Sequence, residues 1–388
     1  MKIHFGQINF RAGIIKCFVT LKSRCAILMK ITSENSALVS GAYRNFNAGW
    51  ESTFEFKPNN PLVFSDWHCS IFSLNSGSAS SYVLYGLLRE KCFNQPLVSV
   101  CSNNAWIILK TLSSITAVEK NTGTEIYSDI TDVTQLASDG YSVYCIRDET
   151  LCLLTITKLE GITTIDRPFG FSVKIKSISC GLGFLLCLTF SGQVFSQGIG
   201  RWVSCFLNSN VFTSSRGQLG LGDLSERTEL TLIEALQILT VTQISAGHWH
   251  SACLTDTGDV YTWGWNEHGQ LGHKSLGVKN KLGIISENER QSCVSVLAIP
   301  TPVDFPDELS ISQISCGGRH TVCLTEDGIV FCFGWNGYGQ LGLDSSVEAV
   351  DIPVKQTVLT AQQLKSNLTV SSVSCGLWST SLQLNSKH

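Results

Sequence analysis

A long pattern that occurs twice limits the fold of this chain more than any other feature. Residues 245–273 read SAGHWHSACLTDTGDVYTWGWNEHGQLGH, and residues 315–343 read SCGGRHTVCLTEDGIVFCFGWNGYGQLGL. The two copies have the same length, and their glycines fall at matching offsets. Because self-similarity at a fixed period is the signature of a repeat architecture, the repeat has to be interpreted before any local motif.

One copy of the pattern encodes short strands. Apolar and polar residues alternate between the glycines, which is the period of a half-buried β-strand. We expect strands over 243–246, 250–254 and 260–264, with a hairpin turn at Thr257-Gly258-Asp259. The glycine-rich stretch 266–272 is a connection to a short fourth strand. About four strands per unit, repeated radially, is typical of a β-propeller blade.

Weaker copies extend the repeat toward both ends of the chain. Each copy begins at a lead position, held by glycine in the clear copies: Asp66, Ser102, Ser138, Gly181, Gly247, Gly317 and Gly376. The last copy stops after about two strands, and residues 41–50 resemble its missing half. The sequence therefore predicts an all-β, seven-bladed β-propeller that is closed by N-terminal strands pairing with the C-terminal blade, because closure removes open sheet edges.

The repeat also predicts the domain boundaries. Residues 1–40 are expected to be an N-terminal extension, with Met29 as the authentic start; the alternative is a genuine extra arm. The propeller then spans 41–388 and carries two inserts. We interpret the insert 201–215 as either a rim loop or translated intron, and 274–297 as a flexible loop on one face that could carry functional contacts.

Composition excludes several classes of function. The net charge is −3 with no basic block, so strong direct nucleic-acid binding is not expected, and no long apolar run predicts a membrane helix. The 16 cysteines lack zinc-site spacing, and they recur at two repeat positions, one held by Cys187, Cys253 and Cys323 and the other by Cys180, Cys316 and Cys375. Recurrence at one position indicates small buried side chains rather than disulfides. There is no P-loop, GxSxG or HExxH motif, so neither an enzyme nor a cofactor or metal site is predicted.

The motif at 246–272 and 316–342, with a half-copy at 216–222, resembles the regulator of chromosome condensation repeat family. The resemblance is clear from residue 180 to 384 and weak over 41–179. It implies a propeller of that type, in the nucleus and cytoplasm and associated with chromosomes. It further implies a JmjC-domain 2-oxoglutarate oxygenase as partner, a link to histone modification and mitotic chromosome segregation, and contact with histones or chromatin through that partner.

Several repeat positions are expected to be structural. The lead glycines Gly181, Gly247, Gly317 and Gly376 are required where the backbone is strained or closely approached. His250 and His320 occupy one repeat position. A catalytic or metal role would need carboxylates or further histidines nearby, so we interpret both histidines as donors or acceptors of a hydrogen bond within their own blade.

Positions beside the lead glycine vary between copies and should line one mouth of the ring. Variable residues on a fixed scaffold favour partner contact, and Trp249, Arg319 and Trp378 are the strongest candidates. Trp265 and Trp335, which follow the recurring glycine of the third strand, are candidates for either recognition or packing.

Two functions remain open from the sequence. The first is a monomeric, non-enzymatic propeller that binds another protein, by resemblance the JmjC oxygenase. The alternative, also from the family, is a guanine-nucleotide exchange factor for a Ran-type small GTPase.

Overall fold

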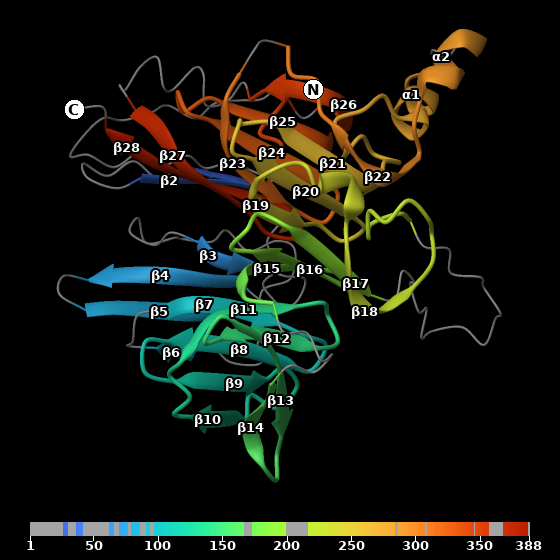
Figure 1. The fold of residues 1–388 in the computed structure, drawn as a ribbon. Coiled ribbons are helices and arrows are strands. Elements are labelled where there is room, and N and C mark those ends of the chain that lie inside the picture. Colours follow the sequence, from blue (N-terminus) through green and yellow to red (C-terminus); the bar gives the residue numbers. More distant parts are fainter. Residues whose placement is uncertain are drawn as a thin grey trace, which may run out of the picture.

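The structure, a computed structural model, is built almost entirely of antiparallel β-sheets (Figure 1). It describes residues 26–29, 36–41, 62–65, 70–76, 79–85, 91–93, 97–166, 173–198, 216–283, 286–306, 309–344, 346–356 and 368–386. Side chains are described from Leu97 onward, except at 165, 166, 282, 287–289, 368 and 384–386. The insert 201–215 and the predicted half-blade beyond Gly41 lie outside these residues, as do Met1 and most of the N-terminal extension.

The described strands form seven four-stranded sheets. Four of them comprise the N-terminal and middle part of the chain: β3 (Leu62–Ser65), β4 (Ser70–Ser76), β5 (Ala79–Tyr85) and β6 (Lys91–Phe93); β7 (Leu97–Ser102), β8 (Trp106–Thr111), β9 (Ile115–Glu119) and β10 (Glu125–Ser128); β11 (Val133–Ser138), β12 (Val143–Arg147), β13 (Thr150–Thr157) and β14 (Gly161–Asp166); β15 (Ile175–Gly181), β16 (Phe184–Thr189), β17 (Val194–Gly198) and β18 (Arg227–Leu232).

The three remaining sheets contain the clearest repeats and both ends of the described chain. They are β19 (Val241–Ala246), β20 (His250–Thr255), β21 (Val260–Trp265) and β22 (Val296–Pro302); β23 (Ile311–Cys316), β24 (His320–Thr325), β25 (Val330–Trp335) and β26 (Ala349–Lys355); and β1 (Ala26–Met29), β2 (Ser36–Gly41), β28 (Ser379–Ser386) and β27 (Leu368–Cys375). Within the last sheet β2 pairs with β28 in register from Ser36↔Leu384 to Gly41↔Ser379. Residues assigned to the N-terminal extension are thus strands here, while Met29 as the start remains a prediction.

The hydrophobic cores lie between consecutive sheets. Leu186 of β16 packs with Ile244 of β19, whereas its neighbour Leu185 packs with Tyr144 of β12. The strands β8, β16, β20 and β24 are consequently buried at every position. Alternation predicted half-buried strands, and this was wrong for these four strands, because a sheet on either side covers both of their faces. Cys187, Cys253 and Cys323 confirm the prediction for their position: each is a fully buried thiol.

Polar side chains join neighbouring sheets in the clear repeats. His250 Nε2 lies 2.9 Å from Thr321 Oγ1 in the next sheet, and that hydroxyl donates to the carbonyl of Gln270 at 2.8 Å. Since the Thr321 proton is committed to Gln270, His250 Nε2 must donate. His320 Nε2 lies 3.1 Å from Thr380 Oγ1 in the same way. The predicted hydrogen bond within one blade is therefore wrong: both histidines bond to the following sheet.

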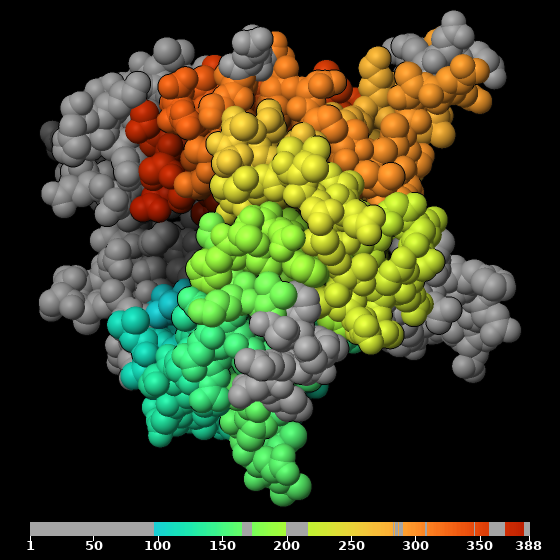
Figure 2. Space-filling view, viewed as in Figure 1, coloured from blue at the N-terminus to red at the C-terminus, as the bar shows by residue number. Residues whose placement is uncertain are grey.

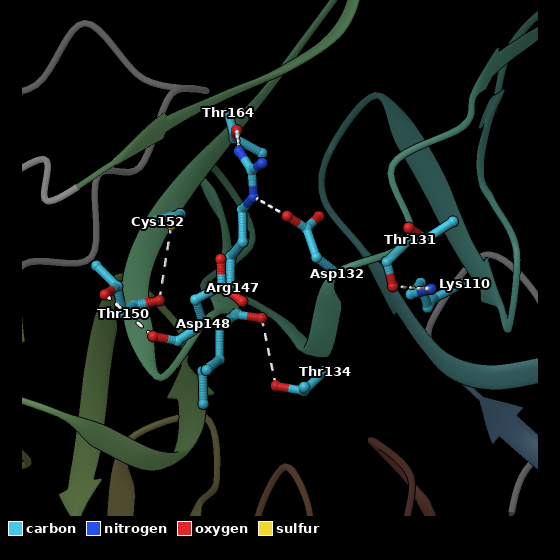
Figure 3. Close-up of polar contacts among 10 residues, drawn as sticks. Lys110, Thr131, Asp132, Thr134, Arg147, Asp148, Thr150, Cys152 and Thr164 are labelled. Carbon is cyan, nitrogen blue, oxygen red and sulfur yellow. Dashed lines mark hydrogen bonds and ion pairs between the residues drawn. The ribbon is translucent and has the colours of Figure 1, made fainter.

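At sheets β7–β10 and β11–β14 a lysine of β8 bonds to the segment before β11, and an ion pair lies within β11–β14 (Figure 3). Arg147 Nε donates to the carboxylate of Asp132, and Arg147 Nη1 donates to Thr164 Oγ1 at 3.3 Å. Lys110 is 2% exposed in β8, and its Nζ donates to the carbonyls of Thr111 at 2.6 Å and Thr131 at 3.4 Å. Burial lowers the pKa of Lys110, and the Asp132 carboxylate opposes that shift.

The insert after β21 is not an irregular loop. It contains α1 (Leu276–Leu282) and α2 (Glu287–Ser292), which project from the body of the molecule in Figure 1. Ser275 accepts a hydrogen bond from the Val278 N–H at 3.4 Å, and Gly283 ends α1 in the left-handed region at φ 68°. A serine N-cap and a glycine C-terminal cap are recognised helix signals, and the low periodicity between them concealed the helix. The only other helix among the described residues is the 3-10 turn η2 (Glu234–Leu236).

Candidate protein-binding surface

One end of the sheets β15–β28 carries the turns that follow the first strands and the connections that follow β17, β21 and β25. Antiparallel neighbours place these two kinds of segment at the same end. Backbone hydrogen bonds tie them together: the Trp265 N–H donates to the Trp249 carbonyl at 2.9 Å, and the Trp335 N–H donates to the Arg319 carbonyl at 2.8 Å. Side chains from both kinds of segment therefore meet on one surface.

The glutamines of the three GQLG sequences hold the turns that carry this surface. In each unit the side-chain oxygen of the glutamine accepts the backbone N–H of the residue two positions earlier, at 2.9 Å. Gln218 holds Arg216, Gln270 holds His268, and Gln340 holds Tyr338. These three held residues occupy one repeat position, so a constant turn presents a different side chain in each of three units.

Six aromatic side chains form a closed circuit on this surface. Neighbouring ring centroids are 5.1 to 6.2 Å apart, within the range of favourable edge-to-face contacts. In order around the circuit they are His248, Trp249, Trp265, His268, Trp335 and Trp378. Tyr338 packs outside it, 5.0 Å from Trp335.

A guanidinium group lies against the rings of this aromatic circuit. The Cζ of Arg319 is 5.4 Å from the ring centroids of Trp249 and Trp265, 5.6 Å from Trp378 and 6.0 Å from Trp335. A cation over an aromatic face within about 6 Å is attracted by the ring quadrupole. Arg216 approaches from the neighbouring unit and places its Cζ 3.9 Å from the Trp265 centroid. Trp265 therefore contacts both guanidiniums.

The two histidines of the circuit are neutral at physiological pH. Burial, followed by the Arg319 charge, lowers the pKa of His248 and of His268 to about 4. His268 Nε2 lies 3.0 Å from Arg319 Nη1. Arginine can only donate, so this nitrogen must accept, and the His268 proton is on Nδ1.

The lead glycines allow the sheets to approach this closely. A Cβ built on Gly317 would lie 2.0 Å from His320 Cε1 and 2.8 Å from the carbonyl oxygen of Gly376. On Gly247 it would lie 2.2 Å from His250 Cε1 and 2.5 Å from the carbonyl oxygen of Gly317. Neither glycine has a positive φ, so close contact and not backbone strain requires glycine here.

The same holds for Gly181, where a Cβ would lie 1.9 Å from Phe184 Cε1 and 2.3 Å from the carbonyl oxygen of Gly247.

The structure brings all five residues predicted to contact a partner to one place. Trp249, Arg319, Trp265 and Trp335 are partly exposed, while Trp378 is 8% exposed and serves mainly as a wall of the circuit. The two tryptophans around Gly264 have different surroundings: Trp263 is fully buried between two sheets, whereas Trp265 joins the circuit.

Four residues of this surface were not among the predicted contacts, namely His248, Arg216, His268 and Tyr338. The last three share the position before GQLG, which is the signal that would have identified them.

A cavity of about 460 Å³ opens beside the circuit, along the first strands of several sheets. Its lining includes His248, Gly318 and Leu377 near the circuit, and Lys120 and Asp139 on the other side. Burial raises the pKa of Asp139. Among the described residues there is no group of three or more His, Cys, Asp or Glu side chains arranged to hold a metal ion. Nor does that part of the chain contain a helix long and apolar enough to cross a membrane.

The comparisons with known proteins agree with this repeat pattern. A family model described as the regulator of chromosome condensation (RCC1) repeat matches residues 257–324 and 327–382, and a second model of that repeat matches 241–270 and 311–340. Within residues 241–382 the chain thus matches the regulator of chromosome condensation repeat. The family resemblance predicted from the motif is thereby confirmed.

Relatives match these repeats over about half of the chain. RCC1 domain-containing protein 1 of Mus musculus is 33% identical over 232 residues, which cover 55% of this chain and 56% of the relative. The ultraviolet-B receptor UVR8 of Arabidopsis thaliana is 35% identical over 175 residues, which cover 45% of this chain and 32% of the receptor. Yeast RCC1 (Prp20), solved bound to Kap60, is 15% identical with a TM-score of 0.46, covering 74% of this chain and 80% of that one.

Proposed function

We propose that this RCC1-repeat propeller is a non-enzymatic binding protein that grips a partner with its aromatic circuit. The proposal is based on one observation. Trp249 and Trp378 come from turns of two other sheets, yet both rings pack against the guanidinium of Arg319. Tryptophan and arginine are the residues most enriched at energetically dominant interface positions.

The proposed partner is a JmjC-domain 2-oxoglutarate oxygenase. Its support is the family resemblance, together with the 33% identity to RCC1 domain-containing protein 1. The chain spans about half the length of that relative, so partner, chromosome association and location in nucleus and cytoplasm all belong to the proposal. Contact with histones or chromatin would then be made through the partner, by a monomeric propeller.

We also propose that the seven sheets close into one ring of seven blades. The pairing of β2 with β28, which brings strands from near both ends of the chain into one sheet, supports closure. A closed ring leaves no open sheet edge and holds the turns of all sheets in a fixed arrangement.

Binding of the purified oxygenase to variants tests the proposal. Trp249→Ala and Arg319→Ala should each weaken binding by about 1–3 kcal/mol, as truncation of central interface residues does. Leu159→Ala is the matched control, because Leu159 is 98% exposed at the tip of the β13–β14 hairpin, away from the circuit. Circular dichroism melts establish that each variant is folded. Unchanged affinity in both circuit variants would place the contact elsewhere on the molecule.

A nucleotide-release assay tests the exchange-factor alternative. The proposal expects no acceleration of nucleotide release from a Ran-type GTPase by the wild-type protein. Rapid release would replace the proposed function by guanine-nucleotide exchange.

A further inference from the structure

Two positive charges stand side by side within the aromatic circuit. Each of the guanidiniums of Arg216 and Arg319 lies about 5 Å from the Trp249 ring, at 5.1 and 5.4 Å, and both contact Trp265. Both side chains are only partly exposed. Burial lowers the pKa of Arg216, and the charge of Arg319 lowers it further.

Within the described part of the chain, no carboxylate forms an ion pair with either arginine. The ion pairs there join other partners, such as Arg227 with Asp223 at 2.6 Å and Lys281 with Glu348 at 2.6 Å. Glu267 attracts Arg216 only at longer range. Arg319 has one polar contact to a neutral histidine, His268.

Buried donors on both arginines lack acceptors. Arg216 Nη1 and Arg319 Nε are inaccessible to solvent and have no hydrogen-bond partner. Stacking on tryptophan offsets part of the cost of removing a cation from water, but it supplies neither an acceptor nor a negative charge. The surface therefore has an uncompensated positive centre enclosed by apolar rings.

We propose that the Arg216–Arg319 pair binds the carboxylate of an Asp or Glu side chain in a partner protein. This inference rests on the proposed function and names the chemistry by which the partner is recognised. A planar carboxylate can accept charge-assisted hydrogen bonds from guanidinium groups, and the surrounding tryptophans exclude the water that would otherwise screen the contact.

The charges around the pair favour a carboxylate side chain over a nucleic-acid backbone. Glu267 is exposed next to the site, and Glu348 is exposed near His268. The chain as a whole has a net charge of −3. A nucleic-acid backbone requires a broad basic field, which this surface does not provide, whereas one side chain requires only the two guanidiniums.

A pair of peptides tests the inference. Hexaglutamate is titrated into the full chain at low salt while tryptophan indole NMR signals are recorded, and hexaglutamine is the uncharged probe. We expect hexaglutamate to shift indole signals in a saturable way, with an affinity that falls as salt is added, and hexaglutamine to shift none.

Matched neutral substitutions identify the site. Arg319→Gln and Arg216→Gln should each weaken hexaglutamate binding about tenfold, which corresponds to about 1.4 kcal/mol. Lys174→Gln removes an equal charge from an exposed side chain just before β15 and should leave binding unchanged. Equal effects of all three substitutions, or no difference between the two peptides, would overturn the inference. Binding of inorganic phosphate but not of hexaglutamate would also overturn it.

Partner affinity separates this inference from the proposed function. If Trp249→Ala weakens binding of the partner and Arg319→Gln does not, the surface binds a protein but not through a carboxylate. If neither substitution matters, the proposed function itself fails. Dimerisation of the chain that Arg319→Gln abolishes would identify a second copy as the source of the carboxylate and would contradict a separate partner.

Discussion

Sheets β7–β14 and sheets β19–β28 share a four-stranded antiparallel arrangement and are joined to their neighbours by different chemistry. Between β19–β22 and β23–β26 the link is a neutral histidine bonded to the hydroxyl of Thr321. Between β7–β10 and β11–β14 it is a buried lysine, Lys110, near the ion pair of Asp132 and Arg147 (Figure 3). Apolar cores lie between sheets in both regions.

The two regions also differ on their surfaces. In Figure 2 the β13–β14 hairpin projects from the body as a narrow spur (green, at the bottom), with the exposed Leu159 at its tip. Sheets β19–β28 instead keep the glycine turns and GQLG connections that hold the aromatic circuit. The recurring pattern of the repeat therefore has two roles. Its histidines connect neighbouring sheets, and its glycine turns and GQLG connections hold the end of the molecule where side chains differ between units.

The greatest loss of stability is expected on replacement of the lead glycine Gly317. Gly317→Ala places a Cβ 2.0 Å from His320 Cε1, so the ring must move and its contact with Thr380 is lost. We expect the free energy of unfolding to fall by about 3 kcal/mol. Gly161→Ala in β14 is the control: no heavy atom lies within 4 Å, and only its φ of 78° opposes alanine, at a cost of about 1 kcal/mol. Equal shifts in urea midpoints would refute the close-packing role of the lead glycine.

Acid should lower the stability of sheets β19–β28, which histidines connect, before that of sheets β7–β14. Burial lowers the pKa of His250 to about 3 and of His320 to about 4, whereas both titrate near 6.5 when unfolded. The unfolded state therefore binds protons that the folded state does not, and stability falls as pH drops below about 6.5. From pH 7 to 5.5 we expect a loss of about 2 kcal/mol for the two together.

Hydrogen exchange followed by mass spectrometry measures this difference between the regions. Strands β20 and β24 should lose protection at pH 5.5 relative to pH 7 after correction for the intrinsic rate. The sheets β7–β14 contain no histidine among the described residues, and the raised pKa of Asp139 acts in the opposite direction, since it favours the folded state as pH falls. If β8 or β12 lost protection at a higher pH than β20 and β24, the proposed difference between the two regions would be wrong.

The smallest effect on stability is expected for replacement of the buried Lys110. Lys110→Met replaces a buried amine by an apolar side chain of similar volume, and removing a buried charge in this way is often neutral. We expect a change of less than about 1 kcal/mol in either direction. His250→Leu, a comparable replacement in the other region, should cost about 1–2 kcal/mol because it removes a hydrogen bond to Thr321. Chemical denaturation measures the free energy of unfolding of both variants. A larger loss for Lys110→Met than for His250→Leu would mean that the lysine contributes more to stability than the histidine bond.

The clear repeats allowed much of the fold and half of the surface to be predicted. Identical glycine spacing located β19–β21 and β23–β25, and variation beside Gly247 and Gly317 pointed to Trp249 and Arg319. The contacts of the circuit could not be predicted, because they join side chains from turns of different sheets, and spacing within one unit does not place those turns relative to one another.

Other features gave no pattern to follow. A lysine in a strand usually indicates a solvent-facing position, so nothing distinguished the buried Lys110. The histidine bonds cross between sheets, and a partner 71 positions away along the chain cannot be read from spacing within one unit.

Quantitative affinity capture from cell extract, with the wild-type chain, Trp249→Ala and Leu159→Ala as baits, shows whether binding depends on the aromatic circuit. We expect a protein that the wild type and Leu159→Ala retain equally and that Trp249→Ala loses. A partner retained by Trp249→Ala and lost by Leu159→Ala would contradict this expectation, because binding would then belong to the spur of β13–β14 and not to the aromatic circuit.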